Sequence, residues 1–94
     1  MKIYAYGVID SSEKIDESMK GLDGAPLFNI PYRDIGIVVS DLNAQIQKED
    51  KTSVLKHEEV VEMLMDKFTV LPMRFSTLFS GKEQVLLMMK NYYD

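Results

Sequence analysis

The chain has 94 residues, with 46% hydrophobic and 28% charged, which suits one small folded domain and not a disordered segment. Eleven Lys and Arg against 15 Asp and Glu leave a formal net charge of −4, which disfavours general binding to nucleic acid or anionic lipid. The absence of cysteine excludes disulfides, Cys-ligated metals and thiol catalysis, and one histidine cannot form a multi-His metal site.

The first residues lead directly into strand-like sequence, without the charged and apolar regions of a secretory signal peptide. No apolar run approaches the roughly 18 residues that a membrane-spanning helix needs. We therefore expect a cytoplasmic protein without membrane contact.

Residues 2–9 are rich in β-branched and aromatic residues and predict a first strand with two apolar faces. Strict alternation places Tyr4, Tyr6 and Val8 on one face, opposite Ile3, Ala5, Gly7 and Ile9. Residues 12–22 predict a short helix that Ser12 caps, because Ile15, Met19 and Leu22 share one helical stripe.

Two further strands are expected at residues 27–32 and 34–40, and their short connection makes them an antiparallel hairpin. Residues 41–51 are polar and predict a loop or a short helical turn. A helix then follows to residue 67 or 68, with Thr52 or Ser53 as its cap. Its apolar arc consists of Val54, His57, Val61, Leu64, Met65 and Phe68.

Residues 69–75 predict a fourth strand, and residues 83–93 a final helix that continues to the end of the sequence. On this helix Leu87 lies nearly opposite an apolar stripe that comprises Val85, Met88, Met89 and Tyr92.

This order of elements is β-α-β-β-α-β with an added helix, which is the split βαβ pattern of the ferredoxin-like α+β fold. The pattern implies a four-stranded antiparallel sheet in the order 4-1-3-2, with the second and fourth strands at its edges. Pro31 and Pro72 fall in these two strands, and proline is confined to edges because it cannot donate to a sheet ladder.

His57 and Glu58 are the only candidate acid–base pair, but adjacent helix residues project about 100° apart. A packed or hydrogen-bonded histidine is the simpler interpretation. The carboxylates along the same helix fit a solvated face better than a cation site, and the glycines form no phosphate-binding motif. We therefore expect no catalytic residues, no cofactor and no metal.

Two sequence blocks carry a family resemblance. Residues 57–65 read HE-x-VVE-x-LM, residues 70–79 read VLPMRF-x-T-x-F, and residues 4–9 form a matching opening strand. Together they resemble the gas vesicle protein F/L family. The resemblance implies a non-enzymatic accessory protein of gas vesicle assembly, located in the cytoplasm and at the gas vesicle. Such a protein would bind the hydrophobic main shell protein, acting as an assembly chaperone or as a minor component of the shell. Other accessory proteins would be further partners.

Members of that family are more than twice as long and carry a helical, coiled-coil C-terminal domain. Residues 1–94 are therefore expected to form a single N-terminal domain, truncated from a longer two-domain protein. The missing domain, or a second copy in a homodimer, would then cover Leu87 and the Tyr4 and Tyr6 face.

The edge strand carries Phe28 and Ile30, which we expect to contact the shell protein, together with Leu87. His57, Glu58, Pro72 and Arg74 are motif positions, expected to brace helix against sheet through a contact of His57 or Glu58 to Arg74 or to the backbone. Two alternatives stay open. One is a ferredoxin-like domain that binds a small regulatory molecule. The other is an RNA-binding module that would use Tyr4 and Tyr6.

Overall fold

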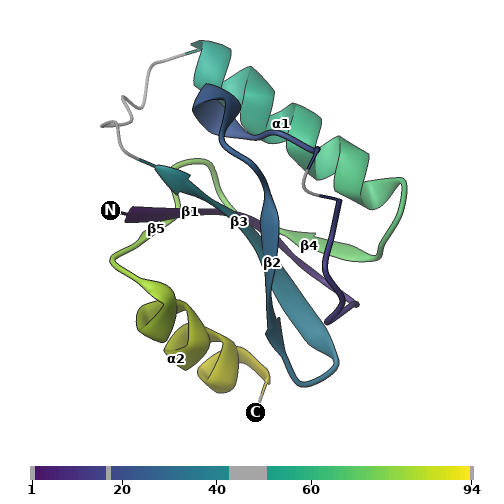
Figure 1. Ribbon diagram of the computed structural model, residues 1–94, viewed down its shortest axis with the longest axis vertical. Helices are drawn as coiled ribbons and strands as arrows, with labels where there is room; N and C mark the ends of the chain where they lie inside the picture. The colour runs from purple at the N-terminus through teal and green to yellow at the C-terminus, as the bar shows by residue number, and fades with distance from the viewer. Residues whose placement is uncertain (1, 17, 43–50, 94) are drawn as a thin grey trace.

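The computed structural model describes residues 2–16, 18–42 and 51–93, and it forms one sheet between two helices (Figure 1). In chain order the elements are β1 Lys2–Ile9, the 3₁₀ turn η1 Leu22–Gly24, β2 Phe28–Tyr32, β3 Ile35–Leu42, α1 Lys51–Met65, β4 Val70–Pro72, β5 Leu78–Phe79 and α2 Lys82–Tyr93.

The sheet is antiparallel and runs β2-β3-β1-β4, with β5 also paired to β1. The predicted α+β class and the predicted strand order are thus confirmed. Pro31 and Pro72 lie in the edge strands β2 and β4, as expected. On either side of β4 the amide of Met73 donates to the Tyr6 carbonyl and the carbonyl of Thr69 accepts from the Asp10 amide, so the backbone of Pro72 faces outward by alternation.

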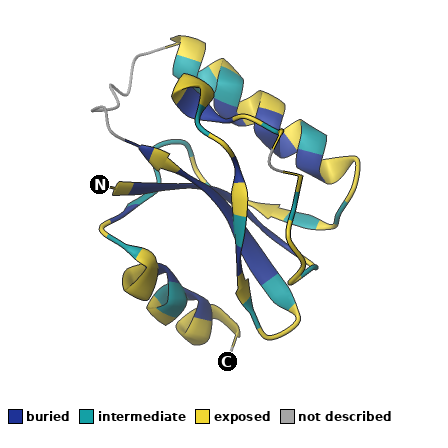
Figure 2. Ribbon diagram, viewed as in Figure 1, coloured by how far each residue is buried: buried dark blue, intermediate teal, exposed yellow. Residues whose placement is uncertain are grey.

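Two apolar cores lie on opposite faces of the sheet, and successive residues of β1 and β3 contribute to one or the other. Figure 2 shows buried residues on the sides of α1 and α2 that face the sheet. Under α2, the core contains Ile3, Ala5, Val8, Ile30, Ile37, Val39, Phe79, Val85 and Met89. Under α1, it contains Tyr4, Tyr6, Ile9, Leu22, Leu27, Val38, Leu42, Val60 and Leu64.

The predicted alternation along β1 is correct only as far as Tyr6. The pairing with β3 shifts between Ala5 and Gly7, which is a β-bulge. The extra residue reverses the faces, so Val8 joins the α2 core and Ile9 joins the α1 core. The expectation for these two residues was therefore wrong.

The helix predicted over residues 12–22 is also wrong, since the described residues there form turns and a bridge between Lys20 and Pro26. The segment is short and polar, and isolated helices of this length are marginal in water. The carbonyls of Ser11 and Glu13 are hydrogen-bonded by a side chain and not by a helical backbone. Each accepts from Nδ2 of Asn29 at 2.9 Å. A Cβ at Gly36 would collide with this amide, which explains a glycine within β3.

The fourth strand is interrupted. Only Val70–Pro72 and Leu78–Phe79 pair with β1, along the same edge, and residues 73–77 form a loop between them. The strand predicted at residues 69–75 is therefore shorter than expected, and β5 was missed.

The predicted helices are present with small changes. Thr52 and Ser53 lie inside α1, not at its cap, and most of the loop expected at residues 41–51 falls outside the described residues. On α1, Val60 is buried while Met65 is 55% exposed. On α2, Val85 and Met89 are buried as predicted, while Tyr92 is largely exposed.

Candidate functional site

A chain of buried hydrogen bonds joins β1, α1 and the loop between β4 and β5. The Tyr4 hydroxyl lies 2.7 Å from His57 Nδ1, and His57 Nε2 lies 2.9 Å from the Met73 carbonyl. A carbonyl oxygen can only accept, so Nε2 carries a proton, and in the neutral ring Nδ1 accepts from the Tyr4 hydroxyl. Tyr4 in turn accepts from the Ser76 amide at 3.0 Å. Both ring nitrogens of His57 are therefore engaged, between the helix and the loop.

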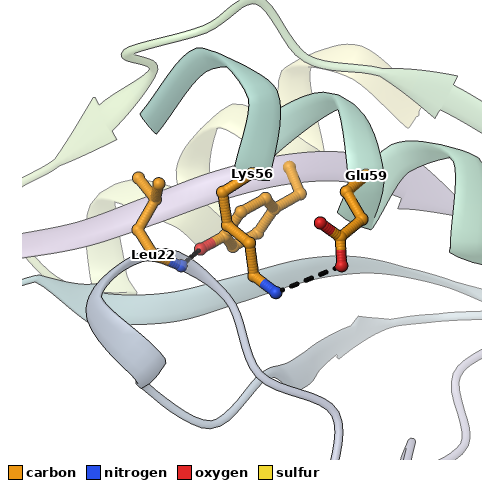
Figure 3. Close-up of polar contacts among 4 residues, drawn as sticks. Leu22, Lys56 and Glu59 are labelled. Carbon is orange, nitrogen blue, oxygen red and sulfur yellow. Dashed lines mark hydrogen bonds and ion pairs between the residues drawn. The ribbon is translucent and has the colours of Figure 1, made fainter. Parts of the chain in front are cut away.

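A second hydrogen-bonded group starts from Tyr6, one position along the same face. Its hydroxyl accepts from the Leu22 amide at 2.9 Å, the bond drawn at Leu22 in Figure 3. It also lies 2.7 Å from Ser40 Oγ on β3. A Cβ on Gly21 would overlap the Tyr6 hydroxyl and come within 2.8 Å of Leu27. Glycine at position 21 is therefore what lets the η1 segment approach Tyr6 closely.

Ring contacts pack the two groups together. His57 stacks on Tyr6 at 5.7 Å between centroids and meets Tyr4 edge-on at 5.6 Å. Phe75, from the loop, closes the cluster at 5.9 Å from the His57 ring. Such pairs each contribute up to about 1 kcal/mol beyond the area they bury.

Burial controls the acid–base properties of the two tyrosines. Desolvation raises the pKa of Tyr4 to about 12, against a smaller lowering by the Ser76 hydrogen bond. Desolvation likewise raises the pKa of Tyr6, opposed by its bonds to Ser40 and Leu22. Both phenols stay neutral at physiological pH, and their partners occupy their polar atoms. The arrangement thus suits a structural brace and not proton transfer to a substrate.

The brace supports the loop that carries the VLPMRF motif. Residues 74–77 line an open hollow of about 520 Å³ on the surface. Thr77 closes the turn, with its amide and its hydroxyl both donating to the Arg74 carbonyl, at 3.2 and 2.6 Å. Ser76 adopts a left-handed conformation with φ of 69°. The loop is therefore a fixed turn, held from beneath by Tyr4 and His57.

A second hollow of about 340 Å³ lies between η1 and the beginning of α1, next to the labelled residues of Figure 3. Lys20, residues 21–24, Thr52, Ser53 and Lys56 line it. Lys56 forms an ion pair with Glu59 at 3.4 Å, a largely solvent-exposed pair of small energetic value.

The structure places the predicted motif residues in different environments. His57 is buried and contacts a backbone carbonyl, whereas Glu58, Pro72 and Arg74 are exposed. The His57 contact is to Met73, one residue before Arg74. The four residues therefore do not gather into one site: His57 holds the loop, and Arg74 is what the loop presents.

The residues predicted to contact a partner are also separated. Ile30 is 2% exposed in the core beneath α2, so its side chain is not available at the surface. Phe28 is 37% exposed on the β2 edge, and Leu87 is 60% exposed on the outer side of α2. The expectation that a missing domain covers the Tyr4 and Tyr6 face is wrong, since α1 and η1 already do so. Fully buried tyrosines cannot stack on bases, which removes the basis of the RNA-binding alternative.

Sequence reasoning expected His57 or Glu58 to contact Arg74 or the backbone. The Met73 carbonyl is such a backbone contact, but Tyr4 was missed as the second partner of His57. Tyr4 is 53 positions from His57 in sequence, and only the fold brings the two side chains together. The same is true of the bonds from Tyr4 to Ser76 and from Tyr6 to Ser40. Two polar-tipped tyrosines at alternate positions of a central strand were the available signal, because a buried tyrosine hydroxyl needs a hydrogen-bond partner.

Within the described part of the chain, no three His, Asp or Glu side chains are grouped so as to hold a metal ion. No helix there is both long enough and apolar enough to span a bilayer.

Comparison with known proteins identifies the class as gas vesicle proteins. The family model described as gas vesicle synthesis protein GvpL/GvpF matches residues 2–94. The chain therefore belongs to the GvpL/GvpF family, and the resemblance seen in its sequence motifs is confirmed.

Similar curated proteins come from Halobacterium salinarum. Gas vesicle protein L1 is 36% identical over 85 residues, covering 83% of this chain and 30% of the relative. Gas vesicle protein L2 is 31% identical over 91 residues, covering 88% of this chain and 33% of the relative. The chain thus spans about a third of the length of the curated relatives it matches.

Two crystal structures of GvpF have the same fold. The protein from Microcystis aeruginosa gives a TM-score of 0.83 at 22% identity, over 98% of this chain and 39% of that one. The protein from Anabaena sp. PCC7120 gives a TM-score of 0.80 at 24% identity, over 98% of this chain and 38% of that one.

Proposed function

We propose that this chain is a non-catalytic binding module of gas vesicle assembly, which acts in the cytoplasm and at the gas vesicle. The observation that carries the proposal is the family match across residues 2–94. The relatives bear the names of gas vesicle proteins. The buried hydrogen-bond network supports a structural role, because its polar atoms are engaged within the protein.

The proposed partner is the hydrophobic main shell protein. This chain would bind it either as an assembly chaperone or as a minor component of the shell. Strand addition at the sheet edges is a poor route to such binding, since Pro31 and Pro72 remove backbone donors from β2 and β4. Contact through exposed side chains fits better, and Phe28 and Leu87 remain the apolar candidates. The hollows beside η1 and at residues 74–77 are open, which suits contact with a protein surface better than an enclosed small molecule at either place.

Co-expression of the tagged chain with the main shell protein tests the proposal. We expect the shell protein to be retained on the tagged chain and to be lost with Phe28→Glu or Leu87→Glu. Leu55→Glu is the matched control, since Leu55 is 68% exposed on α1, in the other layer of the fold. A folded chain that retains no shell protein would contradict the proposal.

A further inference from the structure

The loop at residues 73–77 interrupts an edge strand that would otherwise pair continuously with β1. β4 and β5 lie along one edge of β1. At the ends of the loop the Met73 amide still donates to the Tyr6 carbonyl and the Thr77 carbonyl accepts from the Ala5 amide, so the departure from β1 is confined to residues 74–76. Local departures from strand pairing are common beside functional sites, where they redirect a side chain. Here the redirected side chain is Arg74.

The interior is arranged to hold this loop in one shape. Its backbone is bonded from below at two points, the Met73 carbonyl to His57 and the Ser76 amide to Tyr4. The ring of Phe75 packs in the same buried cluster. Burying a histidine and a phenol costs free energy unless every polar atom is bonded, whereas apolar side chains would fill this space without that requirement. The loop shape is thus what the polar network specifically provides.

The outer surface of the loop presents a cationic donor group. Arg74 is exposed and lines the open hollow of about 520 Å³ with Phe75, Ser76 and Thr77. Among the described residues, no carboxylate of this acidic chain forms an ion pair with its guanidinium. The planar guanidinium matches a carboxylate with two parallel hydrogen bonds, and the Ser76 side chain beside it supplies a hydroxyl.

From this geometry we infer that the Arg74 loop binds a carboxylate side chain of a protein partner. The inference rests on the proposed function. It adds one polar contact, from Arg74, to the apolar contacts proposed for Phe28 and Leu87. The net charge of −4 favours one carboxylate over a polyanion such as nucleic acid or an anionic membrane. The hydrogen-bonded turn fixes the backbone that carries Arg74, so less backbone entropy is lost on contact.

Binding to the main shell protein gives the first test, with the tagged chain and two single variants. Arg74→Gln removes the charge at the loop, and Lys14→Gln removes one charge from the exposed segment after β1. We expect Arg74→Gln to weaken binding by about tenfold or more, the usual effect of losing a charge-assisted hydrogen bond. Lys14→Gln should bind as the unaltered chain does. Equal thermal melting of all three proteins shows that the fold is unchanged.

A zero-length crosslink locates the contact. Arg74→Lys places an amine in the loop, and a carbodiimide joins an amine to a carboxylate only when the two are in contact. We expect an amide between residue 74 and an Asp or Glu of the shell protein, identified by mass spectrometry. If the shell protein binds the unaltered chain but Arg74→Gln binds equally well, the inference is overturned and the proposed function stands. If the unaltered chain binds no shell protein, both are overturned.

Discussion

The hydroxyl of Tyr4 and Nδ1 of His57 lie 2.7 Å apart in the interior, although 53 positions separate the two residues in sequence. This contact ties the central strand β1 to α1, and both residues also hold the backbone of the loop after β4. The His-Glu block and the VLPMRF block, which are separate in the sequence, are thereby parts of one structural unit.

Replacing Tyr4 with Phe should destabilise the protein. The change leaves His57 Nδ1 and the Ser76 amide without their partner, and an unsatisfied buried group costs about 1–3 kcal/mol. Urea unfolding followed by circular dichroism measures the loss. Tyr92→Phe is the control, because Tyr92 is 54% exposed, and it should change stability by less than about 0.5 kcal/mol. Equal effects of the two variants would contradict the role assigned to the Tyr4 hydroxyl.

Stability should be lost at high pH through the same tyrosine. Burial raises the pKa of Tyr4 to about 12 in the folded protein, from the usual 10.0 of a tyrosine, so folding favours the neutral phenol. The contribution is complete below pH 10 and is lost as the pH rises from 10 to 12. The loss of stability through this group is on the order of 2 kcal/mol.

Urea midpoints measured between pH 8 and pH 12 test this pH dependence. We expect the decline to be shallower in Tyr4→Phe, with the remainder due to Tyr6, whose pKa burial also raises. An identical decline in the variant would show that Tyr4 does not contribute.

Gly21→Ala should disrupt the Tyr6 group. The added Cβ would overlap the Tyr6 hydroxyl and press on Leu27, so either η1 moves away or the hydrogen bond to Leu22 is lost. We expect a loss of about 2 kcal/mol or more, measured by chemical unfolding. Gly81→Ala, where the Cβ would meet open space, should cost clearly less, through the weaker capping of α2 by alanine alone. A neutral Gly21→Ala would show that the approach of η1 to Tyr6 is looser than described.

The two sides of α2 should respond differently to truncation. Met89 is completely buried under the sheet, and Met89→Ala should cost about 2–5 kcal/mol through lost burial and a cavity. Leu87→Ala, on the exposed side, should leave the midpoint of unfolding nearly unchanged. A large loss with Leu87→Ala would mean that this side is covered, as a self-association would produce. Sedimentation at several concentrations would detect that.

Several features of the fold were predictable because local sequence determines them. The prolines at positions 31 and 72 marked the edge strands, and helical periodicity identified both helices and the buried Val85 and Met89. The helix expected near Ile15 and Met19 failed because tertiary contacts override a weak apolar stripe. In this case the Asn29 amide bonds the backbone of an extended segment.

The site was less predictable than the fold. Arg74 and His57 were identified as motif residues, but their division of roles depends on a bulge at Tyr6 and on a break in the fourth strand. Neither feature has a periodic signature. Likewise Ile30 shares β2 with the partly exposed Phe28, and only the position of α2 shows that Ile30 is interior.

The most direct test of the proposed role is gas vesicle formation in cells. In a strain that lacks its own GvpL/GvpF-family protein, a chimera in which this chain replaces the matching segment of a full-length relative should restore vesicles. Light scattering that falls irreversibly under applied pressure detects them. The account predicts pressure-sensitive scattering with the chimera and a marked reduction with Arg74→Gln. A folded chimera that accumulates at the normal level without producing any vesicles would contradict it.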